Sequence, residues 1–248
     1  MWRLLFHVLT IVLLTLLTQI GGLAWLVALP FKRRLPAFLL AYALLALAAI
    51  WIAPHFGRVA LSCTERGPLQ VQSWMYCAMN RTYVAPELAD VLAETAGAMD
   101  RAYPGTKTLV LDAGFPFFDG FPLLPHLSHD DGGKADIALY YADGGTYLPG
   151  KTRSPIGYFA FEPGPTECPA AWPSLRWNLA PLQALWPAYE LDEDRTRRVL
   201  QTLAADRRVA SIFIEPHLSA HLGVTGEKIR FQGCRAARHD DHIHLQTR

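Results

Sequence analysis

Two short clusters of histidine and aspartate contain the residues of this chain whose types and spacing could do chemistry. The first cluster contains His126, Ser128 and His129, and Asp136 follows His129 seven residues later. The second lies near the C-terminus and reads His239-Asp240-Asp241-His242-Ile243-His244. Imidazole and carboxylate are usual ligands of a catalytic zinc ion, which takes three protein ligands and leaves a fourth position open. A histidine, a nearby aspartate and a distant histidine would supply that set, so we expect one metal site built from both clusters.

The spacing inside each cluster indicates how its side chains would meet. Successive side chains of a strand point to opposite faces, so His242 and His244 would share one face. Asp136 is expected to open another strand, and the Gly132-Gly133 pair before it lets the backbone fold so that His129 can approach. Either cluster alone could be a solvated surface turn, because short motifs often match by chance. The two clusters together favour the metal site.

The spacing of both clusters resembles that of a known group of zinc peptidases. They are the penicillin-insensitive murein endopeptidases and, more broadly, the superfamily of lysostaphin, the D-Ala-D-Ala carboxypeptidases and the hedgehog signalling domain. The matching pattern is His126-x-x-His129-x6-Asp136 with His239-x-x-His242-x-His244. The resemblance is one of motifs and covers roughly residues 105–140 and 207–247. The N-terminal region and residues 145–190 have no counterpart in it.

The resemblance implies a cofactor and its ligands. One Zn²⁺ per chain would be held by His129, Asp136 and His244. Zinc acts as a Lewis acid on the scissile carbonyl and lowers the pKa of a bound water to about 7. A neighbouring imidazole can accept the proton of that water or, when charged, stabilise the oxyanion.

The resemblance also assigns the residues around the metal. His242 and His239 would be paired histidines beside the bound water, His126 an additional histidine of the endopeptidase pattern, and Ser128 a further piece of the first motif. The D-Ala-D-Ala carboxypeptidases place a glutamate base three residues before the last ligand, where this chain has Asp241. In strand register that carboxylate would point away from the face of His242. We therefore favour His242 as the catalytic base and keep Asp241 as the alternative.

These assignments predict zinc-dependent hydrolysis of peptide bonds in peptidoglycan, by a D,D-endopeptidase that acts on the cross-links. A D-Ala-D-Ala carboxypeptidase is the alternative, but the sequence shows no convincing arginine motif for gripping a terminal D-Ala carboxylate. A zinc-bound module that binds murein or protein without turnover is an alternative of another class, although a purely structural zinc has no need of His239 and His242. The charge balance of 23 basic and 22 acidic residues gives no reason to expect a nucleic-acid partner.

Two uncharged runs dominate the N-terminus. Residues 4–31 and 35–54 contain no Asp, Glu, Lys or Arg, and each is long enough to cross a lipid bilayer. A signal peptide has a shorter apolar core and a small-residue cleavage site, whereas Lys32-Arg33-Arg34 and a second run follow here. We therefore predict an uncleaved two-span transmembrane hairpin, residues 1–56. The positive-inside rule places the basic loop in the cytoplasm and both ends of the hairpin outside, although Arg3 weakly opposes this.

The cysteines agree with an extracytoplasmic domain at residues 57–248, on the periplasmic side of the cytoplasmic (inner) membrane. Cys63, Cys77, Cys168 and Cys234 all follow the second apolar run. An even number of cysteines in an oxidising compartment predicts two disulfides, with three possible pairings. The alternative is four buried free thiols in a cytosolic domain, because cysteine buries readily in any case.

The elements that must position the clusters form an α+β pattern. We expect a small antiparallel sheet that carries the zinc site and is flanked by helices. Helices are predicted from Pro86, after the cap Asp192, and near residues 218–222. Strands are predicted at residues 108–111, 136–141, 209–214, 228–231 and 241–246. The Pro- and Gly-rich residues 144–173 would form a long loop that covers or borders the site.

Overall fold

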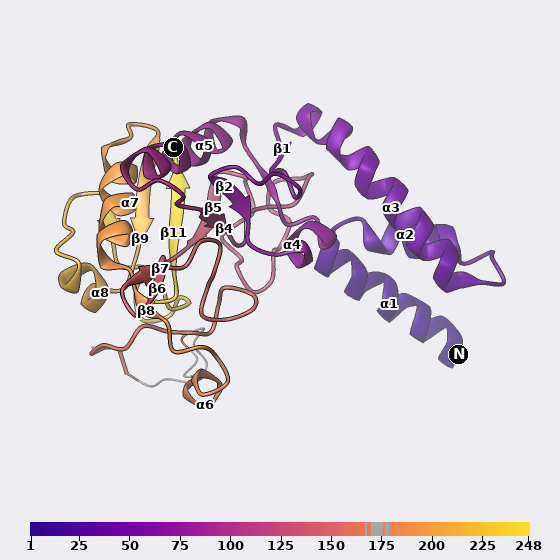
Figure 1. Cartoon of the computed structure of the whole chain (residues 1–248). Coiled ribbons are helices and arrows are strands. Elements are labelled where there is room, and N and C mark those ends of the chain that lie inside the picture. Colours follow the sequence, from indigo (N-terminus) through magenta and orange to yellow (C-terminus); the bar gives the residue numbers. More distant parts are fainter. Residues whose placement is uncertain (167, 170–175, 177–178) are drawn as a thin grey trace.

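The computed structural model of the chain describes residues 1–248 except 167, 170–175 and 177–178 (Figure 1). The helices are α1 (Trp2–Thr18), α2 (Gly21–Ala28), α3 (Arg34–Ile52), the 3-10 helix η1 (Ala53–Phe56), α4 (Trp74–Ala78), α5 (Pro86–Ala102), α6 (Ala180–Gln183), α7 (Glu193–Ala205) and α8 (Pro216–His221). The strands are β1 (Val59–Ala60), β2 (Leu69–Val71), β3 (Tyr83–Val84), β4 (Thr108–Val110), β5 (Lys134–Ala138), β6 (Tyr141–Asp143), β7 (Thr146–Tyr147), β8 (Glu190–Leu191), β9 (Val209–Phe213), β10 (Ile229–Arg230) and β11 (His242–Thr247).

A six-stranded sheet carries both sequence clusters, in the strand order β10-β9-β11-β5-β4-β2. The strand β11 lies between β9 and β5 and runs antiparallel to both, and β5 is antiparallel to β4. The edge strands β10 and β2 are parallel to their neighbours β9 and β4. The predicted α+β class is confirmed, but the sheet is mixed rather than antiparallel. The reason is that helices connect each edge strand to its neighbour, and such a crossover returns the chain in the same direction.

The register of β11 separates a helix-covered face of the sheet from a polar face. His244 lies opposite Asp136 on one side and opposite Phe213 on the other, so the side chains of these three residues share a face. Ile243 points the other way and joins the main hydrophobic core, to which α5 and α7 contribute their apolar stripes. The polar face of β11 and β5 is therefore where a metal site can form.

The helix starts predicted at Pro86 and after Asp192 are confirmed, and the third predicted helix begins at Pro216. All five predicted strands are present, each with at least one end shifted by one to three residues. Helix α5 begins at Pro86, and the side chain of Asp192 caps α7 by accepting a hydrogen bond of 3.0 Å from the backbone N–H of Arg195. The strand expected to run to residue 141 ends at Ala138, because the chain turns into β6 of a separate sheet with the order β7-β6-β8. The last strand begins at His242 and not at residue 241.

The N-terminal region is not the two-span hairpin that its composition predicts. The first apolar run is broken, since α1 ends at Thr18, Gln19 adopts a positive φ of 65°, and α2 begins at Gly21. The side chain of Gln19 donates to the carbonyl oxygen of Phe117 at 2.8 Å and accepts from its backbone N–H at 2.9 Å. A Cβ on Gly22 would lie 2.8 Å from the backbone oxygen of Ile11 in α1, so a glycine lets the two helices turn back on each other.

Among the described residues, one helix is long and apolar enough to cross a membrane. It is the continuous helical segment Arg34–Phe56, with a mean hydropathy of 2.3. Helix α1 packs on α2, and α2 packs on α3. The N-terminus and the loop of Lys32 and Arg33 both lie at the end of this bundle that points away from the sheet (Figure 1). This arrangement places Arg3 at the same end as the basic loop.

All four cysteines form disulfides, as the sequence predicts. Cys63 pairs with Cys77, and Cys168 pairs with Cys234. The alternative of four free thiols is wrong. The first bridge ties the segment after β1 to α4, and the second closes a loop between the long connection before α6 and the segment that precedes β11.

Candidate metal centre

Three buried side chains bring their donor atoms together on the polar face of the sheet. His129 Nε2 lies 3.2 Å from Asp136 Oδ1 and 3.1 Å from His244 Nδ1, and Asp136 Oδ1 lies 2.8 Å from His244 Nδ1. A tetrahedral zinc ion with bonds of about 2.05 Å separates its ligand atoms by about 3.3 Å. The triangle of donor atoms has nearly that size, so these residues fit a zinc ion.

His126 lies on the other side of Asp136. Its Nδ1 is 3.2 Å from Asp136 Oδ2 and 3.0 Å from Asp112 Oδ2. His126, His129 and Asp136 offer donor atoms that all lie within 4.8 Å of one another, so this group too could hold a metal ion. The two sets share His129 and Asp136 and differ in whether His126 or His244 is the third ligand. The set with His244 has the shorter separations.

Burial and the Asp136 carboxylate determine the charges at the centre. Burial raises the pKa of Asp136, but the surrounding His129, His242 and His126 outweigh it and hold the pKa well below its usual range. Burial lowers the pKa of His129, and the neighbouring Asp136 overrides this and raises it. Burial lowers the pKa of His244 to about 4 despite its hydrogen bond with Asp136. A carboxylate next to a neutral imidazole is a metal-binding pair, because neutral imidazole is the form that ligates.

Hydrogen bonds orient the ligand atoms. His129 Nδ1 lies 2.8 Å from the carbonyl oxygen of Ala113, the residue after Asp112 beyond β4; donation to this acceptor leaves the lone pair of Nε2 for a metal. The hydroxyl of Tyr158 donates to Asp136 Oδ2 at 2.8 Å, while Asp136 Oδ1 faces His244. His129 and Asp136 are thus each held by a partner on the side away from the donor atom.

Tyr158 is a site residue that the sequence reasoning did not single out. It belongs to residues 144–173, which were expected to form a long loop that covers or borders the site. Thr146–Tyr147 instead form β7, whereas Tyr158 and Phe159 do border the site. Residues 167 and 170–173 of that prediction lie outside the described residues. A tyrosine in a Gly- and Pro-rich loop next to a predicted site was the available signal.

Asp241 orients His242, contrary to the prediction that it points away. His242 Nδ1 lies 2.5 Å from Asp241 Oδ1, and Asp241 Oδ2 accepts a hydrogen bond of 2.7 Å from the backbone N–H of Phe159. Because β11 begins at His242, Asp241 precedes the strand, and its side chain can turn back toward His242. Burial lowers the pKa of His242, but Asp136 and Asp241 more than offset it and raise the pKa to about 9.

His239 stands beside these residues without joining the donor triangle. Its ring centre lies 4.9 Å from that of His242 and 5.5 Å from that of His244. Burial, followed by the proximity of His242 and His244, holds the pKa of His239 well below its usual range, so it is neutral near pH 7. The backbone N–H of His239 donates to Glu215 Oε1 at 3.2 Å, and the Glu215 N–H donates to the His239 carbonyl at 3.0 Å. Glu215, at the start of α8, therefore positions His239.

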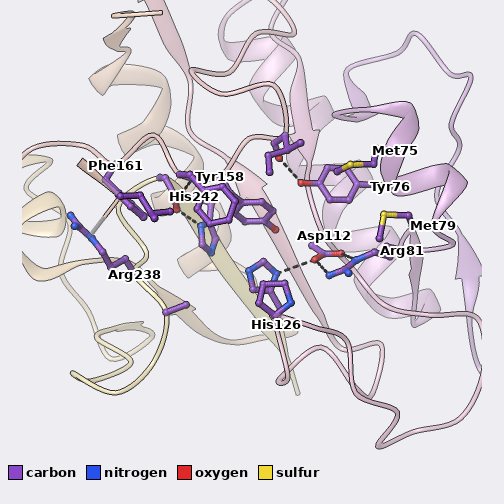
Figure 2. A pocket seen from close by; sticks show the side chains of 16 residues that line it. Met75, Tyr76, Met79, Arg81, Asp112, His126, Tyr158, Phe161, Arg238 and His242 are labelled. Carbon is purple, nitrogen blue, oxygen red and sulfur yellow. Dashed lines mark hydrogen bonds and ion pairs between the residues drawn. The ribbon is translucent and has the colours of Figure 1, made fainter. Parts of the chain in front are cut away.

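A buried ion pair supports His126 from behind, and the sequence reasoning missed it. Figure 2 shows His126 hydrogen-bonded to Asp112, which in turn is held by the guanidinium group of Arg81. Arg81 Nε donates to Asp112 Oδ1 at 2.7 Å, and a second bond joins the same two side chains. The one sequence pattern that includes Arg81 is the triplet Asn80-Arg81-Thr82, which has the form of a glycosylation site and gives no hint of an ion pair. All three residues of that triplet are buried.

The fold brings nearly all of the predicted site residues to one place. Those that meet on or beside the polar face of β11 and β5 are His126, His129, Asp136, His239, Asp241, His242 and His244. Ser128 is partly exposed in the turn between the two histidines of the first cluster and, within the described part of the chain, is not among the donor residues. Comparison of the sequence with models of known protein families and with curated proteins finds no match.

Proposed function

We propose that this chain is a zinc-dependent peptidase that hydrolyses peptide bonds in peptidoglycan, with His129, Asp136 and His244 as the zinc ligands. The observation that supports it most is the triangle of donor atoms, whose sides of 2.8–3.2 Å are close to those of a tetrahedral zinc site. Two histidines and one carboxylate form the ligand set of a hydrolytic zinc, which keeps one position open. When bound, zinc would supply Lewis-acid polarisation of a carbonyl group and activation of a water molecule.

His242 is suited to move the proton of the attacking water. Its Nε2 lies 3.7 Å from Asp136 Oδ2, next to the donor triangle, and Asp241 holds the other ring nitrogen. With its pKa raised to about 9, His242 is largely charged near pH 7 in the metal-free chain. A bound Zn²⁺ would offset the charge of Asp136 and favour the neutral ring, which can accept a proton. The charged ring can then stabilise a developing oxyanion. Asp241 acts through His242 in this scheme and is a positioning residue.

His239 adds a second imidazole on the same side. Because it is buried and neutral, it can donate one hydrogen bond and accept another. Such a group can hold the scissile carbonyl or the attacking water in place. This pair of histidines beside the donor triangle favours an enzyme over a module that only binds zinc, since a structural zinc site has no need of either.

The arginines near the centre favour an endopeptidase over a carboxypeptidase. Arg81 is paired with Asp112, and Arg238 is paired with Asp240. A carboxypeptidase needs a cation to bind the terminal carboxylate of its substrate, and both of these guanidinium groups already have a carboxylate partner. We therefore favour cleavage within cross-links over removal of a terminal D-Ala.

The compartment fits the same proposal. The two disulfides are typical of an oxidising environment, and the apolar segment Arg34–Phe56 can hold the chain at a membrane. The sheet and its site would then lie on the periplasmic side of the cytoplasmic membrane, where peptidoglycan is found.

The test is to incubate the full-length chain, in detergent micelles with one equivalent of zinc, with cross-linked muropeptide dimers. Mass spectrometry should show monomers. Loss of a single D-Ala would instead indicate the carboxypeptidase, and binding of dimers without any product would indicate the non-catalytic module. His242→Ala should retain zinc and lose about 10²–10⁴ in rate. Trp74→Ala, which changes an exposed side chain on α4, is the control and should keep the full rate.

A further inference from the structure

Three phenylalanine rings meet where the apolar segment Arg34–Phe56 ends. The ring centre of Phe56 lies 5.1 Å from that of Phe117 and 5.5 Å from that of Phe118, and those of Phe117 and Phe118 lie 6.1 Å apart. Phe56 belongs to the apolar segment, whereas Phe117 and Phe118 belong to the loop between β4 and β5 that also carries His129. This aromatic cluster therefore joins the α+β domain to the end of the helix.

The aromatic cluster is exposed although its side chains are apolar. Phe118 is 62 % exposed and Phe56 is 43 % exposed. Phe118 also adopts a positive φ of 48°, which is uncommon for a bulky side chain and costs free energy. Burial within the chain does not offset this cost, so we expect a partner outside the chain to cover the ring.

The length of the helix sets the depth of the cluster in a bilayer. Lys32 and Arg33 precede the helix and mark its cytoplasmic end under the positive-inside rule. Arg34–Phe56 has 23 residues, so a rise of about 1.5 Å per residue puts Phe56 about 33 Å from Arg34. The hydrocarbon core of a bilayer is about 30 Å thick, so Phe56 reaches the headgroup layer on the far side. Aromatic and apolar side chains bind at this boundary.

The parts of the domain that lie against the N-terminal helices carry no charge. Residues 67–80 and 113–118 contain no Asp, Glu, Lys, Arg or His. The carbonyl oxygen of Ala78 in the first segment accepts a hydrogen bond from Tyr42 in the middle of α3. The backbone of Phe117 in the second segment bonds the turn between α1 and α2. This rim of the domain can therefore enter the lipid beside the helix without burying a charge.

We propose that the aromatic cluster of Phe56, Phe117 and Phe118 is a membrane-binding surface of the α+β domain, covered by lipid at the boundary of headgroups and acyl chains. Lipid is favoured over a second copy of the chain because the cluster continues directly from the helix, and only 6 % of the most apolar stretch of that helix is buried within the chain. The inference does not depend on the proposed peptidase activity. Its consequence is that the loop of His129 is held at the membrane surface.

A probe at the tip of this loop measures its depth. All four cysteines form disulfides, so a single added cysteine can be labelled selectively. Phe118→Cys is labelled with the fluorophore NBD in the full-length chain, which is reconstituted in vesicles of phosphatidylethanolamine and phosphatidylglycerol. The emission should shift to shorter wavelength and be quenched by lipids that carry a doxyl group near the glycerol, but not by aqueous iodide. Quenching by iodide without any effect of the doxyl lipids would overturn the inference.

Leu185→Cys is the matched control. Leu185 is also apolar and is 67 % exposed, close to the 62 % of Phe118. It follows α6, which lies on the side of the molecule away from α1 and α3 (Figure 1). Its label should be quenched by iodide and not by the doxyl lipids. Equal quenching of the two labels would show that Phe118 makes no particular contact with lipid, and the inference would be wrong.

The unmodified chain gives a result that needs no variant. A phospholipid with a diazirine near its headgroup should form photo-adducts on peptides that contain residues 113–121, identified by mass spectrometry. Adducts confined to the N-terminal helices would refute the membrane-binding surface. Phe118→Asp should lose the loop adducts and Phe118→Leu should keep them, with the circular dichroism of both unchanged. If Phe118→Asp does not fold, the adducts of the unmodified chain decide.

Two outcomes would assign the cluster to something other than lipid. If Phe118→Cys forms a disulfide between two copies of the chain in the vesicles, a second copy covers the cluster and the inference fails. If the full-length chain stays in the aqueous fraction when vesicles are floated, no membrane surface exists for the cluster to bind. Loss of muropeptide cleavage with the depth and the adducts as expected would defeat the proposed function and leave this inference standing.

Discussion

Asp136 is the residue on which the site depends, because both candidate ligand sets include it and its two oxygens face different partners. Oδ1 faces His129 and His244, whereas Oδ2 faces Tyr158, His126 and, at 3.7 Å, His242. A metal on the Oδ1 side would leave Oδ2 to hold the Tyr158 hydroxyl. The identity of the third ligand therefore decides which side of the carboxylate binds the metal.

Substitution of the two competing histidines separates these arrangements. We expect His244→Ala to lose bound zinc and His126→Ala to keep one equivalent, because the donor atoms of His129, Asp136 and His244 have the spacing of a tetrahedral site. Metal content of the purified full-length variants, measured by atomic emission, gives the answer. His129→Ala is the positive control and should lose zinc in either case. Zinc retained by His244→Ala but lost by His126→Ala would show that His126 is the ligand.

The pair of His242 and Asp241 makes a second prediction at this scale. His242→Ala removes the proposed base, so the rate should fall by about 10²–10⁴. Asp241→Asn keeps the shape of the side chain that orients His242, so its loss should be smaller than that of His242→Ala. Both variants should bind zinc fully, which is checked on the same samples. If Asp241→Asn is inactive and His242→Ala is near wild type, the base is Asp241 and the carboxypeptidase reading gains support.

At the scale of elements, the pairing of β11 with β5 creates the site. Asp136 and His244 are directly opposite in the register, so two donors from distant parts of the chain are brought within hydrogen-bond distance by backbone pairing alone. A slip of one residue would turn His244 into the hydrophobic core and Ile243 onto the polar face. The apolar face that α5 and α7 cover therefore stabilises the register on which the site depends.

The cap of α7 offers a measurable contribution to that support. Asp192 accepts the backbone N–H of Arg195 at 3.0 Å, so Asp192→Ala should lower the free energy of unfolding by about 1 kcal/mol. The matched control on the same helix is Asp194→Ala. The side chain of Asp194 is 77 % exposed and its pair with Arg197 lies at the surface, so the expected change is below about 0.5 kcal/mol. Urea unfolding of the full-length chain compares the two variants, and equal losses would refute the capping role.

At the scale of the whole molecule, the N-terminal helices and the α+β domain form a continuous structure. Gln19 bonds the backbone of Phe117, and the hydroxyl of Tyr42 donates to the carbonyl oxygen of Ala78 in α4 at 2.5 Å. Tyr42 precedes Phe56 by 14 residues in Arg34–Phe56, which corresponds to about 21 Å at about 1.5 Å per residue. The domain therefore packs along α3 and not only against its end.

The arrangement of these helices predicts a topology that differs from that of a two-span hairpin. The N-terminus lies at the same end of the bundle as Lys32 and Arg33 (Figure 1). If the positive-inside rule holds, a reporter fused at Met1 should be active in the cytoplasm, and one fused at Arg248 should be active only in the export compartment. A hairpin would place both fusions in the export compartment. A cytoplasmic signal from the Arg248 fusion would also defeat the proposed function, because peptidoglycan would be out of reach.

The sequence by itself determined the features that depend on local patterns. The alternation of His242 and His244 predicted that these two side chains share a face, because side-chain direction in a strand follows from a period of two. The Gly132-Gly133 pair indicated that His129 could approach Asp136. Helix α5 followed from Pro86 and its apolar stripe, and α7 followed from its cap at Asp192. These signals lie within a few residues of one another and need no knowledge of the fold.

Only the tertiary structure decided what depends on partners distant in the sequence. The pairing of the cysteines, the support of Asp136 by Tyr158 and the buried pair of Arg81 and Asp112 join segments whose sequences carry no record of each other. The break at Gln19 belongs to the same class. The apolar run around Gln19 has the composition of a membrane span, but the side-chain amide of Gln19 bonds the backbone of Phe117, 98 positions away in the sequence. A buried polar group needs a partner, and the fold decides which one it finds.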